Sequence, residues 1–231
     1  MIEAKDLVKS YGNTEVLNIP YIKINSGESF GLVGNNGAGK TTFFSLMLDL
    51  IEAAKGQVLS DGITVAGSDH WKSYTGAFLD EKYLIEFLYP EEYFKFICDI
   101  NNITKSSFQQ IIAPFNDFFN GAILDQKKFI RDLSKGNQKK VGIAAAMLTK
   151  PKVLILDEPF TNLDPTTVFR LKKMLQELKE EHKTTILISS HDLNHITDVC
   201  ERIVILDNGL VVQDLEHGPD NLKVLEDYFA V

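Results

Sequence analysis

Residues 29–42 read SFGLVGNNGAGKTT, and the organisation of the chain can be worked out from this stretch. Residues 29–33 predict a short buried strand, and the residues after the loop place apolar side chains at helical spacing, namely Phe43, Phe44, Met47, Leu48 and Ile51. Between them, Gly34 to Thr41 satisfies the pattern G-x-x-x-x-G-K-S/T, which is typical of loops that bind phosphate groups. A plain glycine-rich turn is the alternative, but a strand before the loop and a helix after it are the context that the pattern requires.

The loop has the chemistry of a nucleotide site. Its glycines let backbone N–H groups converge on phosphate oxygens, and the N-terminus of the following helix adds a favourable dipole. We expect Lys40 to reach the β and γ phosphates and the Thr41 hydroxyl to bind Mg²⁺. The residues expected to surround the nucleotide phosphates are Gly34, Asn35, Asn36, Gly37, Ala38, Gly39, Lys40, Thr41 and Thr42.

A second group of polar residues follows the aliphatic run 153–156. This run is typical of a strand buried on both faces of a parallel sheet, and it ends in Asp157 and Glu158. A carboxylate at the C-terminal end of such a strand faces the ligand crevice. We expect Asp157 to hold Mg²⁺ and Glu158 to orient or deprotonate the attacking water. Two solvated acids are the alternative, which the phosphate loop elsewhere in the chain weakens.

A third strand, predicted over residues 185–188, ends in Ser189, Ser190, His191 and Asp192. A histidine at this position can contact the γ-phosphate or hold Glu158 in place. From the chemistry alone, a structural histidine is an equal alternative.

The middle of the chain changes in composition. Nine of the 15 phenylalanines fall between residues 78 and 129, and Pro90 is placed to begin a helix there. This segment predicts a helical lobe inserted into an α/β domain. We expect its aromatic side chains to form a packed core, with a partner-binding groove as the alternative.

The flanking segments predict α/β structure. Gly12-Asn13 and Asp61-Gly62 are turn signals between N-terminal strands, and Asp207-Asn208-Gly209 is placed at the turn of a C-terminal hairpin. Asp164 and Pro165 are suitable as the N-cap and first residue of an amphipathic helix.

Composition restricts the class of protein. The 231 residues carry a formal net charge of −8 and are 44% hydrophobic, which is ordinary for a globular chain and wrong for a disordered one. The acidic balance disfavours nucleic-acid binding and a polybasic membrane-surface protein. We expect no membrane-spanning segment and no signal peptide, and we expect Cys98 and Cys200 to be buried, reduced thiols of a cytosolic protein.

Taken together, these motifs resemble those of the nucleotide-binding subunit of an ABC transporter. Besides the phosphate loop (Walker A) and the strand ending in Asp157-Glu158 (Walker B), residues 133–137 are similar to the signature sequence that separates this family from other P-loop ATPases. Residues 161–164 resemble the D-loop, His191 the switch histidine and Tyr11 the aromatic residue that stacks on adenine. The resemblance runs over nearly the whole chain.

The resemblance implies a fold and a set of roles. It implies an α/β fold with a P-loop NTPase, RecA-like core, an N-terminal antiparallel β subdomain and an inserted helical subdomain. Residues 1–80 and 149–231 would form the ATP-binding core, and residues 81–148 the helical signature subdomain. It implies ATP and Mg²⁺ as ligands, with Glu158, His191 and Lys40 in catalytic roles.

The resemblance also implies a head-to-tail dimer, of identical subunits or of close paralogues, around two ATP molecules. Each ATP would lie between Walker A of one copy and the signature of the other, where Ser134 and the N–H of Gly136 grip the γ-phosphate. Asp164 would communicate between the two sites. A separate polytopic permease would hold the subunit on the inner face of the membrane, with its coupling helix placed around residues 83–96.

Two positions depart from the usual family pattern. The signature has Lys135 and Asn137 where glycine and glutamine are commonest, and lysine there resembles the subgroup that serves ABC-2-type exporters. Asp80 aligns with a glutamine that senses Mg²⁺ and the membrane subunit, so a carboxylate is expected to approach the metal there.

The leading hypothesis is therefore an ATPase subunit of a membrane exporter. A soluble ABC ATPase that serves as an assembly or mechanical module is the alternative, because fold and motifs do not separate the two. A third hypothesis, an ATP-binding switch with weakened hydrolysis, is disfavoured by the presence of Lys40, Glu158 and His191.

Overall fold

Two β-sheets organise the molecule. The computed structural model describes residues 1–103, 108–216, 218 and 221–229. The first sheet is antiparallel, with strand order β2-β1-β4-β5, formed by β1 (Ile2–Tyr11), β2 (Thr14–Ile24), β4 (Lys55–Ser60) and β5 (Ile63–Thr64). The second has the order β10-β9-β3-β8-β7-β6, formed by β3 (Ser29–Val33), β6 (Thr75–Phe78), β7 (Val153–Asp157), β8 (Thr185–Ser190), β9 (Arg202–Asp207) and β10 (Leu210–Glu216).

Parallel pairing brings the polar strand ends together. In the second sheet β3 lies between β8 and β9, and β7 lies between β8 and β6, with all four of these pairs parallel. Asp157 is in register with Ser189 on β8, and Val33 is in register with Ser190. The phosphate loop after β3, the acids after β7 and His191 after β8 therefore leave the same edge of the sheet, as the sequence predicts.

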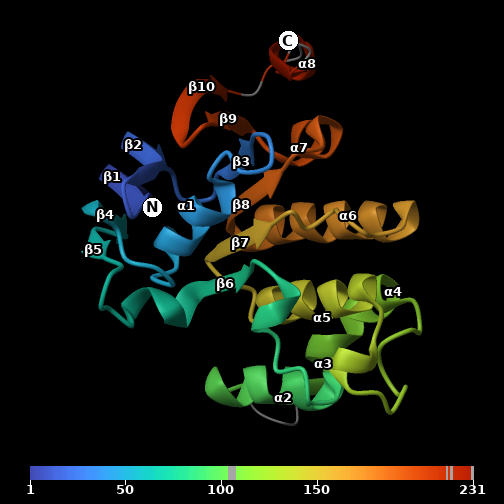
Figure 1. The fold of residues 1–231 in the computed structure, drawn as a ribbon. Helices are drawn as coiled ribbons and strands as arrows, with labels where there is room; N and C mark the ends of the chain where they lie inside the picture. The colour runs from blue at the N-terminus through green and yellow to red at the C-terminus, as the bar shows by residue number, and fades with distance from the viewer. Residues whose placement is uncertain (104–107, 217, 219–220, 230–231) are drawn as a thin grey trace.

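Helices cover both faces of this sheet. Figure 1 shows α1 (Lys40–Met47) between the two sheets, and α6 (Pro165–His182) and α7 (Leu193–Val199) on the opposite side of the second sheet. A last helix, α8 (Asn221–Phe229), lies beyond β10 near the C-terminus. A 3₁₀ turn, η1 (His70–Tyr74), leads into β6.

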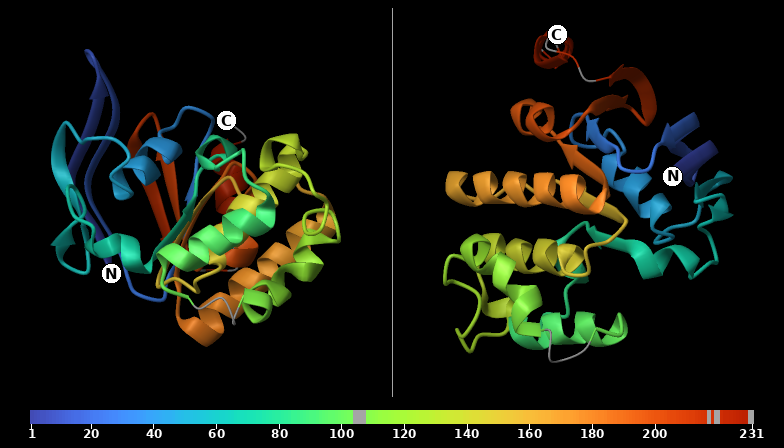
Figure 2. Two further views of the ribbon diagram at one scale, coloured as in Figure 1. Left: turned by 90° about the horizontal axis from the view of Figure 1, so that it is seen from below. Right: turned by 180° about the vertical axis from the view of Figure 1, so that it is seen from behind.

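All of the regular secondary structure in the described part of the segment between β6 and β7 is helical, with loops between the helices. The segment forms a layer at one end of the molecule, visible in the lower part of Figure 1 and in both views of Figure 2. Its elements are η2 (Glu81–Tyr83), α2 (Pro90–Ile100), α3 (Phe108–Ile112), η4 (Ala113–Phe115), α4 (Asn116–Phe119), η5 (Ile130–Asp132) and α5 (Lys135–Met147). As predicted, Pro90 is the first residue of a helix.

Side-chain alternation along the central strands divides the core in two. Val153, Ile155 and Leu187 pack with α1 and the antiparallel sheet, whereas Leu154 and Leu156 pack with the helices on the other face. This is the period-2 alternation of a strand that is buried on both sides. The two clusters fix the central strands from both faces, and so fix the site at their ends.

The aromatic side chains of the helical layer largely form a packed core. Phe94 stacks on Phe119 with ring centroids 5.6 Å apart, and Phe115 stacks on Phe119 at 5.9 Å. Phe87 and Phe96 are exceptions, because they are 64% and 42% exposed. Core packing is therefore confirmed for most of the cluster, and an exposed aromatic minority remains.

Other sequence expectations hold with local differences. Asp164 is the N-cap of α6 and Pro165 its first residue, as predicted. The helix after the phosphate loop is shorter than its apolar pattern suggests, because it ends at Met47 and Asp49 has a left-handed φ of 51°. Both cysteines are buried and free, and burial raises the pKa of each thiol, which keeps both protonated.

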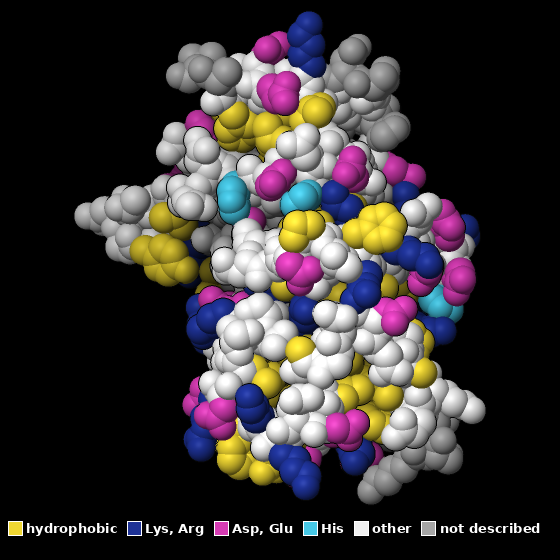
Figure 3. Space-filling view, turned by 90° about the vertical axis from the view of Figure 1, so that its right-hand side faces the viewer, with side chains coloured by type: hydrophobic (Ala, Val, Ile, Leu, Met, Phe, Trp, Pro, Cys, Tyr) yellow, Lys and Arg dark blue, Asp and Glu magenta, His cyan; other side chains and the backbone are white. Residues whose placement is uncertain are grey.

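One face of the molecule carries both signs of charge. On the face drawn in Figure 3, acidic and basic side chains are interspersed, with hydrophobic side chains in separate groups among them. In the part of the chain that the structure describes, no helix has the length and apolar character needed to cross a bilayer.

Candidate nucleotide site

The phosphate loop has the backbone that its glycines predict. Gly37 and Gly39 have φ values of 85° and 108°, in the region that side chains disfavour, and Gly39 is the N-cap of α1. A Cβ on Gly34 would overlap the carbonyl oxygen of Leu206 on β9. The loop therefore passes tightly over the sheet edge and leads the N-terminus of α1 into the site.

Lys40 lies at the start of α1 and folds back over the loop. Its ammonium donates to the carbonyl oxygens of Gly34 at 2.7 Å and Asn35 at 3.3 Å, and its side chain is 6% exposed. A buried charge needs partners, and the loop carbonyls supply them. The same atom lies 3.5 Å from Oε1 of Glu158, so Lys40 joins the loop to the end of β7.

Thr41 and Asp157 meet in the site. The Thr41 hydroxyl donates to Oδ2 of Asp157, and the Ser189 hydroxyl donates to Oδ1. Burial raises the pKa of the Asp157 carboxyl, while these two hydrogen bonds oppose the rise. A hydroxyl beside a carboxylate is the oxygen donor set that Mg²⁺ prefers, so the residues present are suitable for that ion.

Glu158 and His191 also lie together. Nδ1 of His191 is 2.9 Å from Oε2 of Glu158, and Oε1 of Glu158 faces Lys40. The two catalytic candidates from different strand ends are thus in direct contact. Of the two roles considered for His191, the contact favours holding Glu158 in position.

Three residues of this region were missed by sequence reasoning as site members. Ser189 accepts from the Glu158 N–H at 2.9 Å besides binding Asp157. Lys139 and Thr161 both donate to the Glu158 carbonyl oxygen at 2.9 Å. A signal existed for Ser189, because it directly follows the aliphatic run 185–188 and pairs with Asp157 across parallel strands.

A cavity of about 260 Å³ opens over these groups. It is lined by Tyr11, Val16, Asn36, Gly37, Gly39, Lys40, Thr41, Thr42 and Glu158. Tyr11, at the end of β1, is 55% exposed, and the Lys9 ammonium lies 4.8 Å from its ring centroid. The aromatic residue expected at the adenine thus lies at the mouth of the phosphate cavity, on a different sheet from the loop.

The signature residues lie elsewhere in the chain. Ser134 is the N-cap of α5, and its hydroxyl accepts from the Asn137 N–H at 3.3 Å. Gly136 lies against the D-loop segment, because a Cβ there would be 2.8 Å from the Asn162 carbonyl oxygen. Among the described residues, no hydrogen bond or ion pair links Ser134, Gly136 or Asp164 to the phosphate loop.

Asp80 lies outside the phosphate cavity as the structure places it. It follows β6, and its carboxylate accepts from the Lys82 N–H at 2.8 Å and lies 3.9 Å from the Lys82 ammonium. It lines a second cavity, of about 540 Å³, between β6 and α2. The structure therefore does not bring Asp80 into contact with Thr41 or Asp157.

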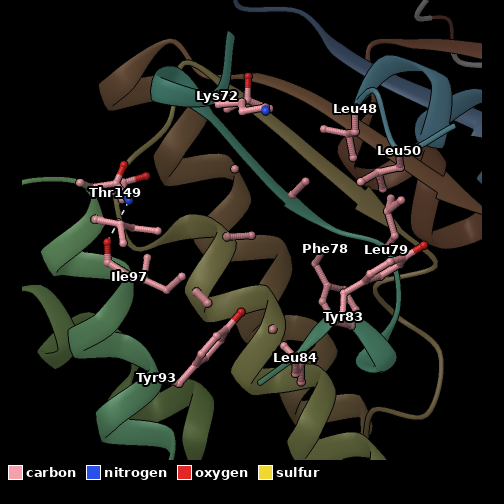
Figure 4. A pocket seen from close by; sticks show the side chains of 18 of the residues that line it. Leu48, Leu50, Lys72, Phe78, Leu79, Tyr83, Leu84, Tyr93, Ile97 and Thr149 are labelled. Carbon is pink, nitrogen blue, oxygen red and sulfur yellow. Dashed lines mark hydrogen bonds between the residues drawn. The ribbon is translucent and has the colours of Figure 1, made fainter. Parts of the chain in front are cut away.

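The second cavity is a groove with aromatic walls. Figure 4 shows Tyr83 and Leu84 from the η2 region and Tyr93 and Ile97 from α2 facing it. Leu50, 49% exposed, comes from the segment after α1 on its other side. The groove therefore lies where the helical layer meets the α/β layers.

Comparison with known proteins identifies the family. The family model described as ABC transporter matches residues 17–161. The chain is 30% identical over 226 residues to the lantibiotic transport ATP-binding protein SrtF of Streptococcus pyogenes, covering 97% of this chain and 95% of that protein. It is 31% identical to the bacitracin transport ATP-binding protein BcrA of Enterococcus faecalis, covering 93% of this chain and 69% of BcrA.

Other relatives and solved structures agree. An uncharacterised ABC transporter ATP-binding protein of Nostoc is 36% identical over 83% of this chain, which spans only 57% of that relative's length. A solved ATP-binding subunit of an ABC transporter matches with a TM-score of 0.84 and 28% identity, covering 100% of this chain and 93% of that one. A dimeric bacterial ABC transporter cassette, 24% identical over 94% of this chain and 99% of its own, shows the same fold with a TM-score of 0.84. The chain therefore belongs to the ABC transporter family, and within it to the ATP-binding subunits, which hydrolyse ATP.

Proposed function

We propose that this subunit uses ATP hydrolysis to drive a separate membrane-spanning partner that exports its substrate. The observation that carries the proposal is the contact of Lys40, Glu158 and His191 at one edge of the sheet, because it assembles a hydrolytic site from three distant segments. Lys135 in the signature and the relatives named for bacitracin and lantibiotic transport support export.

At the site, each side chain has a proposed role. Lys40 and the loop N–H groups bind the β and γ phosphates, and Glu158 acts as the base that orients or deprotonates water. His191 holds Glu158 through the contact at Nδ1. Thr41 and Asp157 hold Mg²⁺, which supplies charge neutralisation of the phosphates when it is bound.

The functional unit that we propose is a head-to-tail dimer. Ser134 and Gly136 stand at the N-terminus of α5, where backbone N–H groups and the helix dipole favour an anion. They are separate from the phosphate loop of the same chain, which supports their use by the ATP of a second copy. Tyr11 stacks on the adenine and Asp164 lies at the dimer contact in this arrangement.

The groove of Figure 4 is the proposed docking site of the membrane partner. Its lining is largely apolar and aromatic, and it includes exposed side chains such as Tyr83 at 53% and Ile100 at 58%. An amphipathic coupling helix can bury its apolar face in such a groove. We propose that residues 81–148 act as the signature subdomain. These residues form one wall of the groove, and they also include the signature residue Ser134. Docking there would place the subunit at the cytoplasmic face of the membrane.

The experiment that tests the proposal traps the partner. The Glu158→Gln chain is used as bait in detergent-solubilised native cells with Mg-ATP present, and captured proteins are identified by mass spectrometry. The expected result is recovery of a polytopic membrane protein with Glu158→Gln, and its loss when Tyr83 and Ile100, which line the groove, are replaced by serine. Recovery of soluble proteins alone, with the ATP-dependent dimer intact, would favour the assembly-module alternative instead.

A further inference from the structure

The backbone at Glu158 is held in an unusual conformation. Its φ is 47°, in the left-handed region that a non-glycine residue occupies only when its surroundings enforce it. The peptide on its N-terminal side donates to Ser189 at 2.9 Å. The peptide on its C-terminal side presents a carbonyl oxygen that accepts from Lys139 Nζ and the Thr161 hydroxyl, each at 2.9 Å. This conformation decides where the Glu158 carboxylate points.

Lys139 is the donor that comes from outside the loop. It lies on α5, five residues after Ser134, and is only 6% exposed. Its ammonium donates to the Glu158 carbonyl oxygen and to the Thr161 hydroxyl, which itself donates to the same carbonyl oxygen. A charge buried this deeply requires such partners. Burial lowers the pKa of the Lys139 ammonium, and the nearby acids Glu81, Glu158, Asp157 and Asp80 oppose this fall.

The next residue contacts the other end of the same loop. The Lys140 ammonium lies 3.9 Å from Oδ2 of Asp164, the N-cap of α6. The loop between Glu158 and Asp164 is thus attached to α5 at both ends, and α5 begins at the signature residue Ser134.

We propose that Lys139 is a positioning residue, whose hydrogen bonds hold the Glu158 peptide so that the carboxylate faces Lys40 and His191. The proposal rests on the role of Glu158 proposed above. This contact links helix α5, which begins at the signature residue Ser134, to Glu158 of the same chain. The helix whose N-terminus would meet the partner's ATP therefore also sets the orientation of the Glu158 carboxylate in its own chain.

Two nearly isosteric variants test it. Methionine and glutamine are similar in length, but only glutamine can donate to the Glu158 carbonyl. Lys139→Met is expected to lower kcat about 10- to 100-fold, because small misplacements of a catalytic group cost that much. Its Kd for ATP and its Tm are expected to match those of the wild type. Lys139→Gln is expected to keep kcat within about threefold of the wild type.

Controls separate this inference from the proposed function. Lys179→Met removes a partly buried lysine that contacts Ser29 and Glu201 away from the site, and it is expected to leave kcat unchanged. The proposal would be overturned by any of three results. These are a wild-type kcat in both Lys139 variants, an equal loss of kcat in both, or a loss of ATP affinity together with the loss of kcat. If Lys139→Met does not fold, Thr161→Val tests the proposal instead, because it removes the second donor to the Glu158 carbonyl oxygen. A lowered kcat is then expected, and a wild-type kcat would overturn the proposal. If Glu158→Gln itself hydrolyses ATP at the wild-type rate, the proposed function fails rather than this inference alone.

Discussion

Glu158 and Lys40 are in contact, yet their substitution should have different effects. Glu158→Gln keeps the shape of the side chain and one acceptor oxygen, but it replaces the other oxygen with an amide group and removes the base, which contributes on the order of 10²- to 10⁴-fold. It is therefore expected to bind ATP normally and to hydrolyse it at least about 100-fold more slowly. Lys40→Ala removes the buried ammonium that lies over the loop, and it should bind ATP poorly. Binding of a fluorescent ATP analogue and steady-state phosphate release measure the two effects.

A surface lysine supplies the matched control for Lys40. Lys173 on α6 is 69% exposed, and among the described residues its ion pair is with Glu177 on the same helix, so Lys173→Ala should leave both measurements unchanged. Equal turnover by Glu158→Gln and the wild type would remove Glu158 from the catalytic role. Normal ATP binding by Lys40→Ala would remove Lys40 from the phosphate site.

Asp80 gives a second prediction about single residues. An asparagine at this position would keep an oxygen that can accept from the Lys82 N–H, but it would lose the charge that the family resemblance places near Mg²⁺. We expect Asp80→Asn to raise the Mg²⁺ concentration for half-maximal ATPase activity, by roughly two- to tenfold for one lost carboxylate. A titration of activity with Mg²⁺ at fixed ATP checks it, with Asp69→Asn, an exposed acid before η1, as the control. If the Mg²⁺ titration of Asp80→Asn is unchanged, Asp80 has no metal role.

The sequence predicted most site residues because each stands in a short pattern with its own chemistry. Lys40, Thr41, Asp157 and Glu158 follow directly from the loop pattern and the strand end. Lys139 was missed because it lies in the middle of a helix, where a lysine is ordinarily solvated. Only tertiary structure places its ammonium on a carbonyl oxygen 19 residues away. Asp80 was predicted by alignment with a family position, and its distance from Thr41 depends on how η2 packs.

At the scale of the elements, β6 and α5 pack so closely that a single substitution tests their contact. A Cβ on Gly76 of β6 would overlap the carbonyl oxygen of Ala146 on α5. Backbone cannot move aside cheaply, and overpacking of this kind costs about 1–3 kcal/mol. Gly76→Ala is therefore expected to lower the Tm by roughly 3–10 °C in calorimetry.

The adjacent residue provides the control for Gly76. Ala77 is exposed on the same strand, so Ala77→Ser should change the Tm by no more than about 2 °C. An unchanged Tm in Gly76→Ala would mean that α5 shifts away from β6 without loss, and that the groove between the helical layer and the sheet is not rigidly held.

The ends of helices can be predicted from the sequence where an N-cap residue or a proline acts on its own neighbours. The prediction fails where apolar spacing continues beyond the end of the helix. Pro90 and the Asp164-Pro165 pair each begin a helix as predicted, because an N-cap or a fixed φ acts on its own neighbours. Ile51 continues the apolar spacing of α1, but the helix ends four residues earlier at Met47. Ile51 instead packs against the core between the sheets after the turn at Asp49. Side-chain spacing alone does not separate these two outcomes.

At the scale of the whole molecule, the sequence predicted a helical segment inserted into an α/β fold. It did not predict how the helical layer packs against the sheet. The change of composition near residue 78 indicated an inserted helical segment, and the described elements between β6 and β7 are all α-helices or 3₁₀ turns. The sequence left core packing and a partner groove as alternatives for the aromatic residues. The structure shows a packed core that includes Phe94 and Phe119, and it leaves Tyr83 exposed in a groove whose use by a partner stays a proposal. That division depends on which face of each short helix meets α5.

The proposed dimer makes the last prediction, because it requires an anion at the N-terminus of α5. Asp and Asn are both good N-cap residues, so either can replace Ser134 without loss of the helix start. In a Glu158→Gln background with Mg-ATP, Ser134→Asn should still form a dimer in size-exclusion chromatography with light scattering. Ser134→Asp should remain a monomer, because its carboxylate would stand against the γ-phosphate of the partner's ATP. Both variants should bind ATP as single subunits with the same affinity, since Ser134 makes no contact with the phosphate loop of its own chain. A dimer with Ser134→Asp would mean that the two copies do not meet through the signature.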